Sequence, residues 1–331
     1  KFFKYPRLAD LSELADGVTK GRFGAGRESA QCGCVSNEKF YEFFDKYTLE
    51  VVRLFDCEFV HIGMDEVFDF ALCPRCRKRI SDGESMESLF LKHIIHTHDL
   101  LAAAGKTMMM WDDFFELLDI VDKIPRDIVL CNWNYGYIED VPEGHWTNRV
   151  KIDRFSQYDR LGIKYLYCTY ASRCSTTYNQ DGFTRYARKH SPLGAVMTVW
   201  ENSDAFYHSS YLSIAYFGAL INGKINTYKG KVALYRSLTG VTADDAAFLA
   251  SLQISGYGEN LDFTEKYEET GQARQTFYES MRYATSRLNK MANSLDGEKK
   301  DILDGLLIGA EEVYAGVKTH LLARAVFDGY E

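Results

Sequence analysis

Five short apolar runs in the middle of the chain constrain its fold more than any other feature. Their residues are apolar at consecutive positions, which is typical of strands in a parallel sheet that helices cover on both faces. The runs occupy residues 58–63, 107–111, 128–133, 164–170 and 195–200. The sequence therefore predicts an α/β protein.

Helical patterns separate these runs. Residues 37–55 carry aromatic and aliphatic side chains at three- and four-residue steps, and Ser36 or Asn37 can cap the start of this helix. A second amphipathic stretch, residues 85–104, ends at Gly105. Two shorter helical patterns lie near residues 149–161 and 210–221.

Strand–helix repeats of about 30 residues are typical of a (β/α)8 TIM barrel. Five strands are evident, so we expect a barrel that lacks its first three strands in this chain, with a five-stranded open sheet as the alternative. Residues 1–240 would form the barrel domain, holding strands four to eight, and residues 241–331 a helical C-terminal region. Helices are expected there at residues 265–292 and 299–325.

The charge of the chain narrows the class of partner. Lysine and arginine total 39 against 47 aspartate and glutamate residues, a net charge of −8, and no basic run is present. Such a chain is a poor nucleic-acid binder, and we expect a small or sugar-like partner. No window approaches the roughly 18 consecutive apolar residues of a membrane span, so we expect a soluble protein without a membrane partner. The sequence makes no prediction of oligomeric state.

Cysteine usage bears on the cellular compartment. Eight cysteines are too few for a disulfide scaffold at this length, and Cys57, Cys131 and Cys168 lie in or beside apolar runs. We therefore expect a reducing compartment and a cytoplasmic location. Because the first residue is Lys1 and not methionine, we expect that upstream sequence, with any signal peptide, has been lost.

Two adjacent carboxylates follow the first apolar run, which reads His61-Ile62-Gly63-Met64-Asp65-Glu66 at its end. In parallel barrels the carboxyl ends of the strands form the active-site face, where carboxylates suit acid–base chemistry. Neighbouring residues on a strand point to different sides, so Asp65 and Glu66 should have separate roles. The alternative is a solvated acidic pair that caps the next element.

Aromatic and polar side chains close the other runs as well. The groups are Trp111-Asp112-Asp113, Asn132-Trp133-Asn134-Tyr135, Tyr167 to Tyr170, and Trp200-Glu201-Asn202. Aromatic rings stack on the C–H faces of a pyranose while carboxylates and amides bind its hydroxyls. The pattern indicates a sugar-binding pocket, although a single tryptophan of this kind is more often a core residue.

The motif at residues 61–66 resembles the H-x-G-x-D-E signature of glycoside hydrolase family 20, the exo-β-N-acetylhexosaminidases. The order of the later tryptophan and tyrosine motifs is similar too. Residues 4–9 resemble the loop after the third barrel strand in a bacterial branch of that family, which implies a bacterial source. The resemblance spans roughly residues 1–222.

The resemblance implies a retaining hydrolase that removes terminal β-linked N-acetylglucosamine or N-acetylgalactosamine without a catalytic cofactor. The acetamido group of the substrate would act as nucleophile through an oxazolinium intermediate. Glu66 would be the general acid, and Asp65 would hold the acetamido N–H. Tyr170 would donate a hydrogen bond to the acetamido oxygen, with Tyr167 as the rival candidate.

Other residues would form the sugar subsite. The resemblance places Trp111, Trp133 and Trp200 as walls, and Glu201 or Asn202 as the partner of a remote hydroxyl. We also expect His61 and Asp112 to bind substrate. Two other functions stay open: a non-catalytic or truncated sugar-binding homologue, and a metal-dependent barrel hydrolase using His61 and Asp65.

A Cys-x-Cys turn at Cys32 and Cys34 and a Cys-x-x-Cys knuckle at Cys73 and Cys76 could together hold a structural zinc ion. The alternatives are four independent thiols or a disulfide. A group of histidines, His93, His96 and His98, lies inside a predicted helix where residues two or five apart do not share a face. A surface or core role is expected for those histidines.

Overall fold

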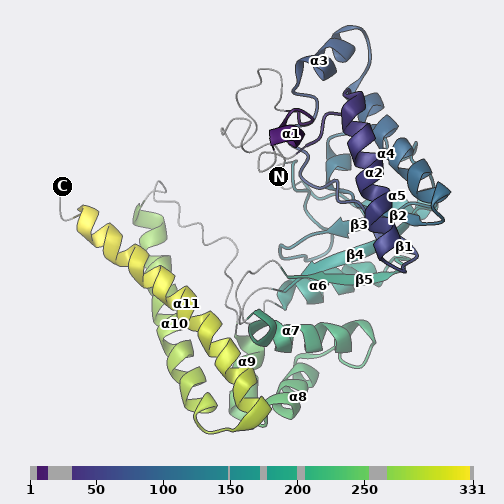
Figure 1. The fold of residues 1–331 in the computed structure, drawn as a ribbon. Helices are drawn as coiled ribbons and strands as arrows, with labels where there is room; N and C mark the ends of the chain where they lie inside the picture. Colours follow the sequence, from purple (N-terminus) through teal and green to yellow (C-terminus); the bar gives the residue numbers. More distant parts are fainter. Residues whose placement is uncertain are drawn as a thin grey trace. The chain divides into compact units, whose positions relative to one another are not determined.

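A computed structural model describes residues 6–13, 32–147, 150–171, 177–199, 206–252 and 267–328. Its five strands form one sheet in the order β1-β2-β3-β4-β5 (Figure 1). The strands are β1 (Phe59–His61), β2 (Thr107–Trp111), β3 (Val129–Trp133), β4 (Lys164–Tyr170) and β5 (Gly194–Thr198). All five predicted strands are confirmed, and their spatial order follows their order in the sequence.

Strands β1, β2 and β3 are parallel. His61 lies opposite Met109, and Trp111 lies opposite Cys131. Because parallel strands end at the same edge of a sheet, the segments that follow His61, Trp111 and Trp133 all begin at that edge. This arrangement brings the motifs after the first three runs into one neighbourhood.

The two long helices of the first unit begin at capping side chains. Helix α2 (Glu38–Leu54) begins after Asn37, whose side chain accepts a hydrogen bond from the backbone of Lys39, as the sequence predicts. Helix α4 (Met86–Ala103) is capped by Ser85 and packs on β2 through a buried apolar face. The shorter elements are α1 (Pro6–Ala9), α3 (Pro74–Ser81), the 3-10 helix η3 (Asp113–Glu116), α5 (Arg154–Leu161) and α6 (Tyr178–Ala187).

The last part of the chain is helical, as expected. It contains α7 (Phe206–Ile221), α8 (Tyr228–Thr239), α9 (Ala243–Ser251), α10 (Tyr267–Ala292) and α11 (Gly297–Asp328). Buried side chains from all five helices, among them Leu212, Tyr235, Leu249, Leu288 and Leu303, form one apolar cluster. Apolar side chains of the last two helices, α10 and α11, therefore serve packing. No helix among the described residues has the length and apolar character needed to cross a membrane.

The chain divides into two compact units. The first contains residues 1–133, 141–167 and 189–194, and the second contains residues 134–140, 168–188 and 195–331. Strands β4 and β5 carry residues of both. The domain boundary expected at residue 240 stays a prediction.

Candidate active site

The segment after β1 has an unusual backbone. Gly63, Met64 and Glu66 have positive φ angles of 77°, 74° and 49°. Residues other than glycine rarely adopt this left-handed backbone conformation, because it costs about 1–2 kcal/mol for each such residue. Strain of this kind is concentrated at functional sites, where surrounding contacts hold it in place. The acidic pair that the sequence singles out therefore lies on a constrained turn, with Asp65 exposed and Glu66 half-buried.

Backbone hydrogen bonds from β2 continue into this turn. The N–H of Ile62 donates to the carbonyl of Met109 at 3.0 Å, and the N–H of Trp111 donates to the carbonyl of Gly63 at 2.9 Å. The backbone N–H of Glu66 donates to Oδ2 of Asp113 at 3.0 Å. The position of Glu66 is thus fixed by the end of β2.

The Asp113 carboxylate gathers three groups from different segments. Besides the Glu66 backbone, it accepts the indole N–H of Trp133 on Oδ1 at 3.1 Å and that of Trp146 on Oδ2 at 3.3 Å. Burial raises the pKa of Asp113. Sequence reasoning noticed the Asp112-Asp113 pair but chose Asp112 as the substrate-binding residue, and it missed Trp146 and its contact with Asp113.

A second carboxylate holds the neighbouring aromatic rings. Glu116 pairs with Nδ1 of His145 at 2.9 Å and accepts the backbone N–H of Trp146 at 3.0 Å. Burial alone would raise the pKa of Glu116, but the bonds from His145 and Trp146 together hold that pKa below its usual value. The rings of Trp133 and His145 lie 3.8 Å apart between centroids, and Phe68 meets Trp146 edge-on at 4.7 Å. The result is an aromatic wall fixed by carboxylates.

His61 and Trp111 form another pair at the same edge of the sheet. Their ring centroids are 4.6 Å apart. Nδ1 of His61 accepts the backbone N–H of Gly63 at 3.1 Å, which leaves Nε2 as the nitrogen that can donate to a ligand. The structure therefore brings together two of the predicted substrate-binding residues.

Asp112 has a different environment from its neighbour. It is 2% exposed, and its Oδ2 accepts from Asn132 at 2.7 Å and from the hydroxyl of Tyr158 at 2.5 Å. Burial raises the pKa of Asp112 to about 7. These contacts join the residue that follows β2 to β3 and α5, and the expected binding of substrate by Asp112 stays a prediction.

The two candidate tyrosines lie in different units. Tyr167 is a buried residue of the first unit, and Tyr170 a buried residue of the second. The backbone N–H of Tyr170 donates to Oδ1 of Asn179 at 3.2 Å, and the Tyr170 ring lies 5.0 Å from that of Tyr135. The remaining predicted substrate-binding residues, Trp200, Glu201 and Asn202, lie outside the described residues.

The predicted metal ligands need one correction. Cys34, Cys73 and Cys76 come together, but the fourth donor in their group is Glu13 and not Cys32. Cys32 instead contacts the backbone of Asp69, and burial raises the pKa of its thiol to about 12. The physical reason is that Glu13 already contacts the cluster, because its Oε2 accepts the backbone N–H of Cys73 at 2.9 Å and its Oε1 lies 3.1 Å from the sulfur of Cys76.

The three helix histidines have separate partners. His93 is buried with the hydroxyl of Tyr41 at 3.2 Å from its Nδ1. His96 pairs with Asp45 at 2.7 Å, and His98 binds Asp127 at 3.0 Å. Their expected core and surface roles are confirmed.

Comparison with known proteins finds a family match in the first part of the chain. Residues 5–150 match the family model described as glycosyl hydrolase family 20, catalytic domain. The resemblance carried by the motif at residues 61–66 is thus confirmed, and the matched segment contains both carboxylates and the aromatic wall.

Two curated relatives are similar to shorter stretches. A beta-hexosaminidase of Vibrio furnissii is 30% identical over 97 residues, which are 28% of this chain and 15% of that protein. The beta-hexosaminidase subunit beta of Rattus norvegicus is 29% identical over 111 residues, 31% of this chain and 20% of that protein. These matches cover a fifth or less of each relative.

Two solved structures give longer but weaker matches. The β-N-acetylhexosaminidase from Bacteroides fragilis NCTC 9343 is 17% identical with a TM-score of 0.41, covering 83% of this chain and 49% of that one. The chitobiase of Flavobacterium johnsoniae is 14% identical with a TM-score of 0.44, covering 96% of this chain and 57% of that one. The chain thus spans about half the length of each.

Proposed function

We propose that this chain, whose residues 5–150 match the catalytic domain of glycosyl hydrolase family 20, hydrolyses terminal β-linked N-acetylhexosamine. The observation that carries the proposal is the strained turn that presents Asp65 and Glu66 and is tied through Glu66 to Asp113. The expected partner is a glycan or glycoconjugate that ends in N-acetylglucosamine or N-acetylgalactosamine.

The proposed chemistry divides the work between the two carboxyl groups. Asp65 accepts the acetamido N–H of the substrate and orients its carbonyl oxygen toward C1. That oxygen forms a bond to C1 while the C1–O glycosidic bond breaks, and protonated Glu66 donates its proton to the departing oxygen. The Glu66 carboxylate then takes a proton from the water that attacks C1 and opens the oxazolinium ring. No cofactor enters this sequence of steps.

The aromatic residues would form the subsite for the terminal sugar. Trp111 and Trp133, expected as walls from the sequence, are both partly exposed, so each has ring surface to offer a ligand. Trp146 joins them because its indole shares the Asp113 carboxylate with Trp133. Ring faces held by hydrogen bonds at their N–H groups remain available for stacking on a pyranose. Tyr170 is proposed as the donor to the acetamido oxygen.

We also propose that β1 to β5 correspond to strands four to eight of a (β/α)8 barrel. The parallel pairing of β1 with β2 and of β2 with β3 supports this assignment, as does the acidic pair at the carboxyl end of β1. Strand β1 lies at one end of the described strand order, where a further strand would pair with it in a closed barrel.

A reducing, cytoplasmic location is proposed on separate grounds. The seven cysteines within the described ranges are all free thiols; six of them are buried, and Cys57 is half-buried. Free thiols persist where disulfides are kept reduced.

Release of nitrophenol from aryl glycosides tests the function. The chain should hydrolyse the β-glycosides of N-acetylglucosamine or N-acetylgalactosamine, and it should leave the β-glucoside intact because that substrate lacks the acetamido nucleophile. Equal hydrolysis of the β-glucoside would contradict the substrate-assisted mechanism. Saturable binding of an N-acetylhexosamine without any hydrolysis would replace the proposal by the sugar-binding alternative.

A further inference from the structure

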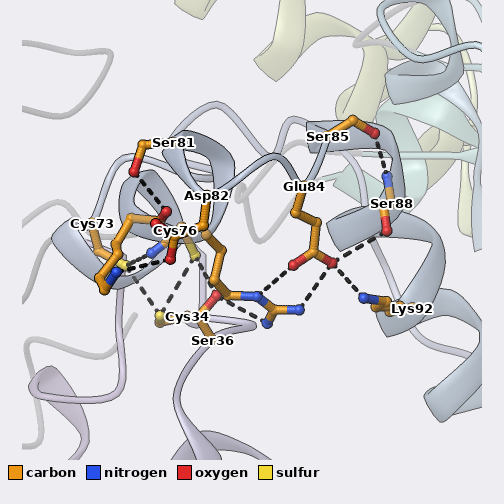
Figure 2. A network of polar contacts seen from close by, with 12 residues as sticks. Cys34, Ser36, Cys73, Cys76, Ser81, Asp82, Glu84, Ser85, Ser88 and Lys92 are labelled. Atoms are coloured by element: carbon orange, nitrogen blue, oxygen red, sulfur yellow. Dashed lines mark hydrogen bonds and ion pairs between the residues drawn. The ribbon is translucent and has the colours of Figure 1, made fainter.

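We propose that Glu13, Cys34, Cys73 and Cys76 form a structural zinc site. Their four donor atoms all lie within 4.8 Å of one another, and all four side chains are 0% exposed. The cysteines come from two distant segments that meet at the start of α3 (Figure 2). The inference is independent of the proposed hydrolase activity.

The distances between donors suit a tetrahedral ion. Sγ of Cys34 lies 3.2 Å from that of Cys73 and 3.9 Å from that of Cys76, whose sulfur is 3.1 Å from Oε1 of Glu13. Ligands around zinc at about 2.3 Å for sulfur and about 2.1 Å for oxygen stand about 3.5–3.8 Å apart. Small side-chain adjustments therefore place all four donors around one ion.

Backbone pairing delivers Glu13 and Cys34 to the site. The N–H of Cys34 donates to the carbonyl of Leu11 at 2.7 Å, and the N–H of Glu13 donates to the carbonyl of Cys32 at 3.0 Å. These bonds flank an antiparallel bridge between Ser12 and Gly33. The two donors are therefore fixed by main-chain contacts and do not depend on the ion for their approach.

Gly33 permits this arrangement. A Cβ atom at this position would lie 2.0 Å from the ring of Phe40 in α2, which is closer than any real contact. The absence of a side chain lets the Cys-x-Cys turn pack directly on the helix. The glycine between the cysteines is thus required by packing.

The other two thiols come from the first turn of α3. Cys73 is the N-cap residue, and its sulfur accepts the backbone N–H of Cys76 at 3.3 Å, with Pro74 at the first helical position. The backbone N–H of Cys73 donates to Oε2 of Glu13 at 2.9 Å. Amide N–H groups that point at the ligands stabilise thiolate and carboxylate charge, as the surroundings of a metal site do.

Polar side chains continue outward from the thiols (Figure 2). Ser36 Oγ lies 3.1 Å from the Cys76 sulfur and accepts from Arg79 at 3.3 Å. Arg79 pairs with Glu84 at 2.7 Å, and Lys92 also pairs with that carboxylate. This chain of contacts places a guanidinium close to a group of four acidic donors, which offsets part of their charge.

The chemistry of the donors favours zinc among metals. Thiolate ligands select soft or borderline ions, whereas calcium and magnesium prefer oxygen. Four protein donors without an open position describe a structural site, because catalytic zinc keeps a place for water or substrate. Burying three thiolates and a carboxylate together is costly unless a cation compensates their charge.

The proposed zinc site lies close in sequence to the strained turn that carries Asp65 and Glu66. Glu66 precedes Cys73 by 7 residues, and short backbone contacts run between them, from Phe68 to Glu66 and from Phe70 to Val67. An ion bound at Cys73 therefore anchors the far end of the segment that carries the two carboxylates.

The test uses the full 331-residue chain purified from zinc-supplemented cells. Elemental analysis should find one zinc ion per chain, and replacement by cobalt should give the visible bands of a tetrahedral ion together with sulfur-to-cobalt charge transfer. Zinc-free protein that shows no such bands on adding cobalt would overturn the proposal. So would a mass lower by two hydrogens, which would indicate a disulfide.

Variants identify the ligands. Cys34→Ser and Cys76→Ser should lose the metal, and Glu13→Gln should keep the charge-transfer bands while its affinity falls about 10-fold or more. Cys32→Ser is the matched control, since this buried thiol lies two residues from a proposed ligand and should keep full metal content. Loss of metal from Cys32→Ser equal to that from Cys34→Ser would contradict the ligand set. If a serine variant does not fold, cobalt titration of the unmodified chain still decides whether the ion binds.

Discussion

The backbone N–H of Glu66 donates to Oδ2 of Asp113 across 3.0 Å, and this bond joins the turn after β1 to the start of η3. Glu66 has a positive φ, so its backbone would relax without an external partner. The same carboxylate accepts the indoles of Trp133 and Trp146. One buried group therefore sets both the orientation of the proposed acid and the wall beside it.

Replacing the proposed acid should remove turnover and leave the fold intact. Glu66→Gln keeps the size of the side chain but cannot donate a proton, so kcat on an aryl N-acetylhexosaminide should fall about 100-fold or more. Glu58→Gln, an exposed change just before β1, is the matched control and should keep normal activity. Unchanged turnover in Glu66→Gln would exclude the role proposed for this residue.

Asp113 is expected to act as a positioning residue. Asp113→Ala removes the acceptor for Glu66, Trp133 and Trp146 at once, and kcat should fall about 10-fold or more because a displaced catalytic group loses its alignment. Asp113→Asn retains one acceptor oxygen and should recover part of kcat. If Asp113 has a purely structural role, stability should fall in both variants while kcat per folded molecule stays constant. Kinetics measured well below the unfolding temperature would distinguish the two roles.

His93 should make the protein sensitive to acid. Burial lowers the pKa of His93 from 6.5 to about 4, so the folded state binds this proton less readily than the unfolded state. Its contribution to stability is present above pH 6.5 and is lost as the pH falls toward 4, by up to about 3 kcal/mol. His93→Gln should therefore flatten the decline of the unfolding midpoint over that range. An unchanged decline would contradict the prediction.

His98 provides a control of opposite sign. Burial alone would lower the pKa of His98, but hydrogen bonds to Asp127 and Asp99 raise it above its usual value. Its contribution is present below the unfolded pKa and is lost as the pH rises. His98→Gln should thus lower stability mainly on the acid side, in contrast to His93→Gln.

Gly33→Ala should destabilise the first unit. The added methyl group would overlap the Phe40 ring, and overpacking of this kind costs about 1–3 kcal/mol. The double variant Gly33→Ala with Phe40→Leu should recover part of the loss, since the two positions interact directly. Gly218→Ala in α7, where a Cβ has open space, should be neutral or stabilising in the same thermal unfolding experiment.

The strands and the main helices could be predicted because their signals are local. Consecutive apolar residues marked all five strands, and Asn37 marked the start of α2 through its own side chain. The Asp-Glu pair was equally visible, because a family motif at residues 61–66 surrounds it. Each of these features is contained within a few neighbouring residues.

Contacts between distant segments could not be predicted in the same way. Trp146 reaches Asp113 across 33 positions, and nothing in the sequence around either residue specifies the other. Glu13 lies in an ordinary stretch, and backbone pairing of residues 11–13 with residues 32–34 brings it to the thiols. The doubled aspartate at Asp112 and Asp113 was noticed, but burial and not sequence decides which of them faces Glu66.

Strand β1 has a further consequence for the behaviour of the protein in solution. It ends the described strand order with Phe59 44% exposed, and Leu54 and Phe55 ahead of it are 72% and 61% exposed. An apolar edge strand is a template on which strands of other molecules add, and charged side chains at such an edge prevent this. We expect the purified chain to self-associate as its concentration rises, and Phe59→Lys to keep it monodisperse in light scattering.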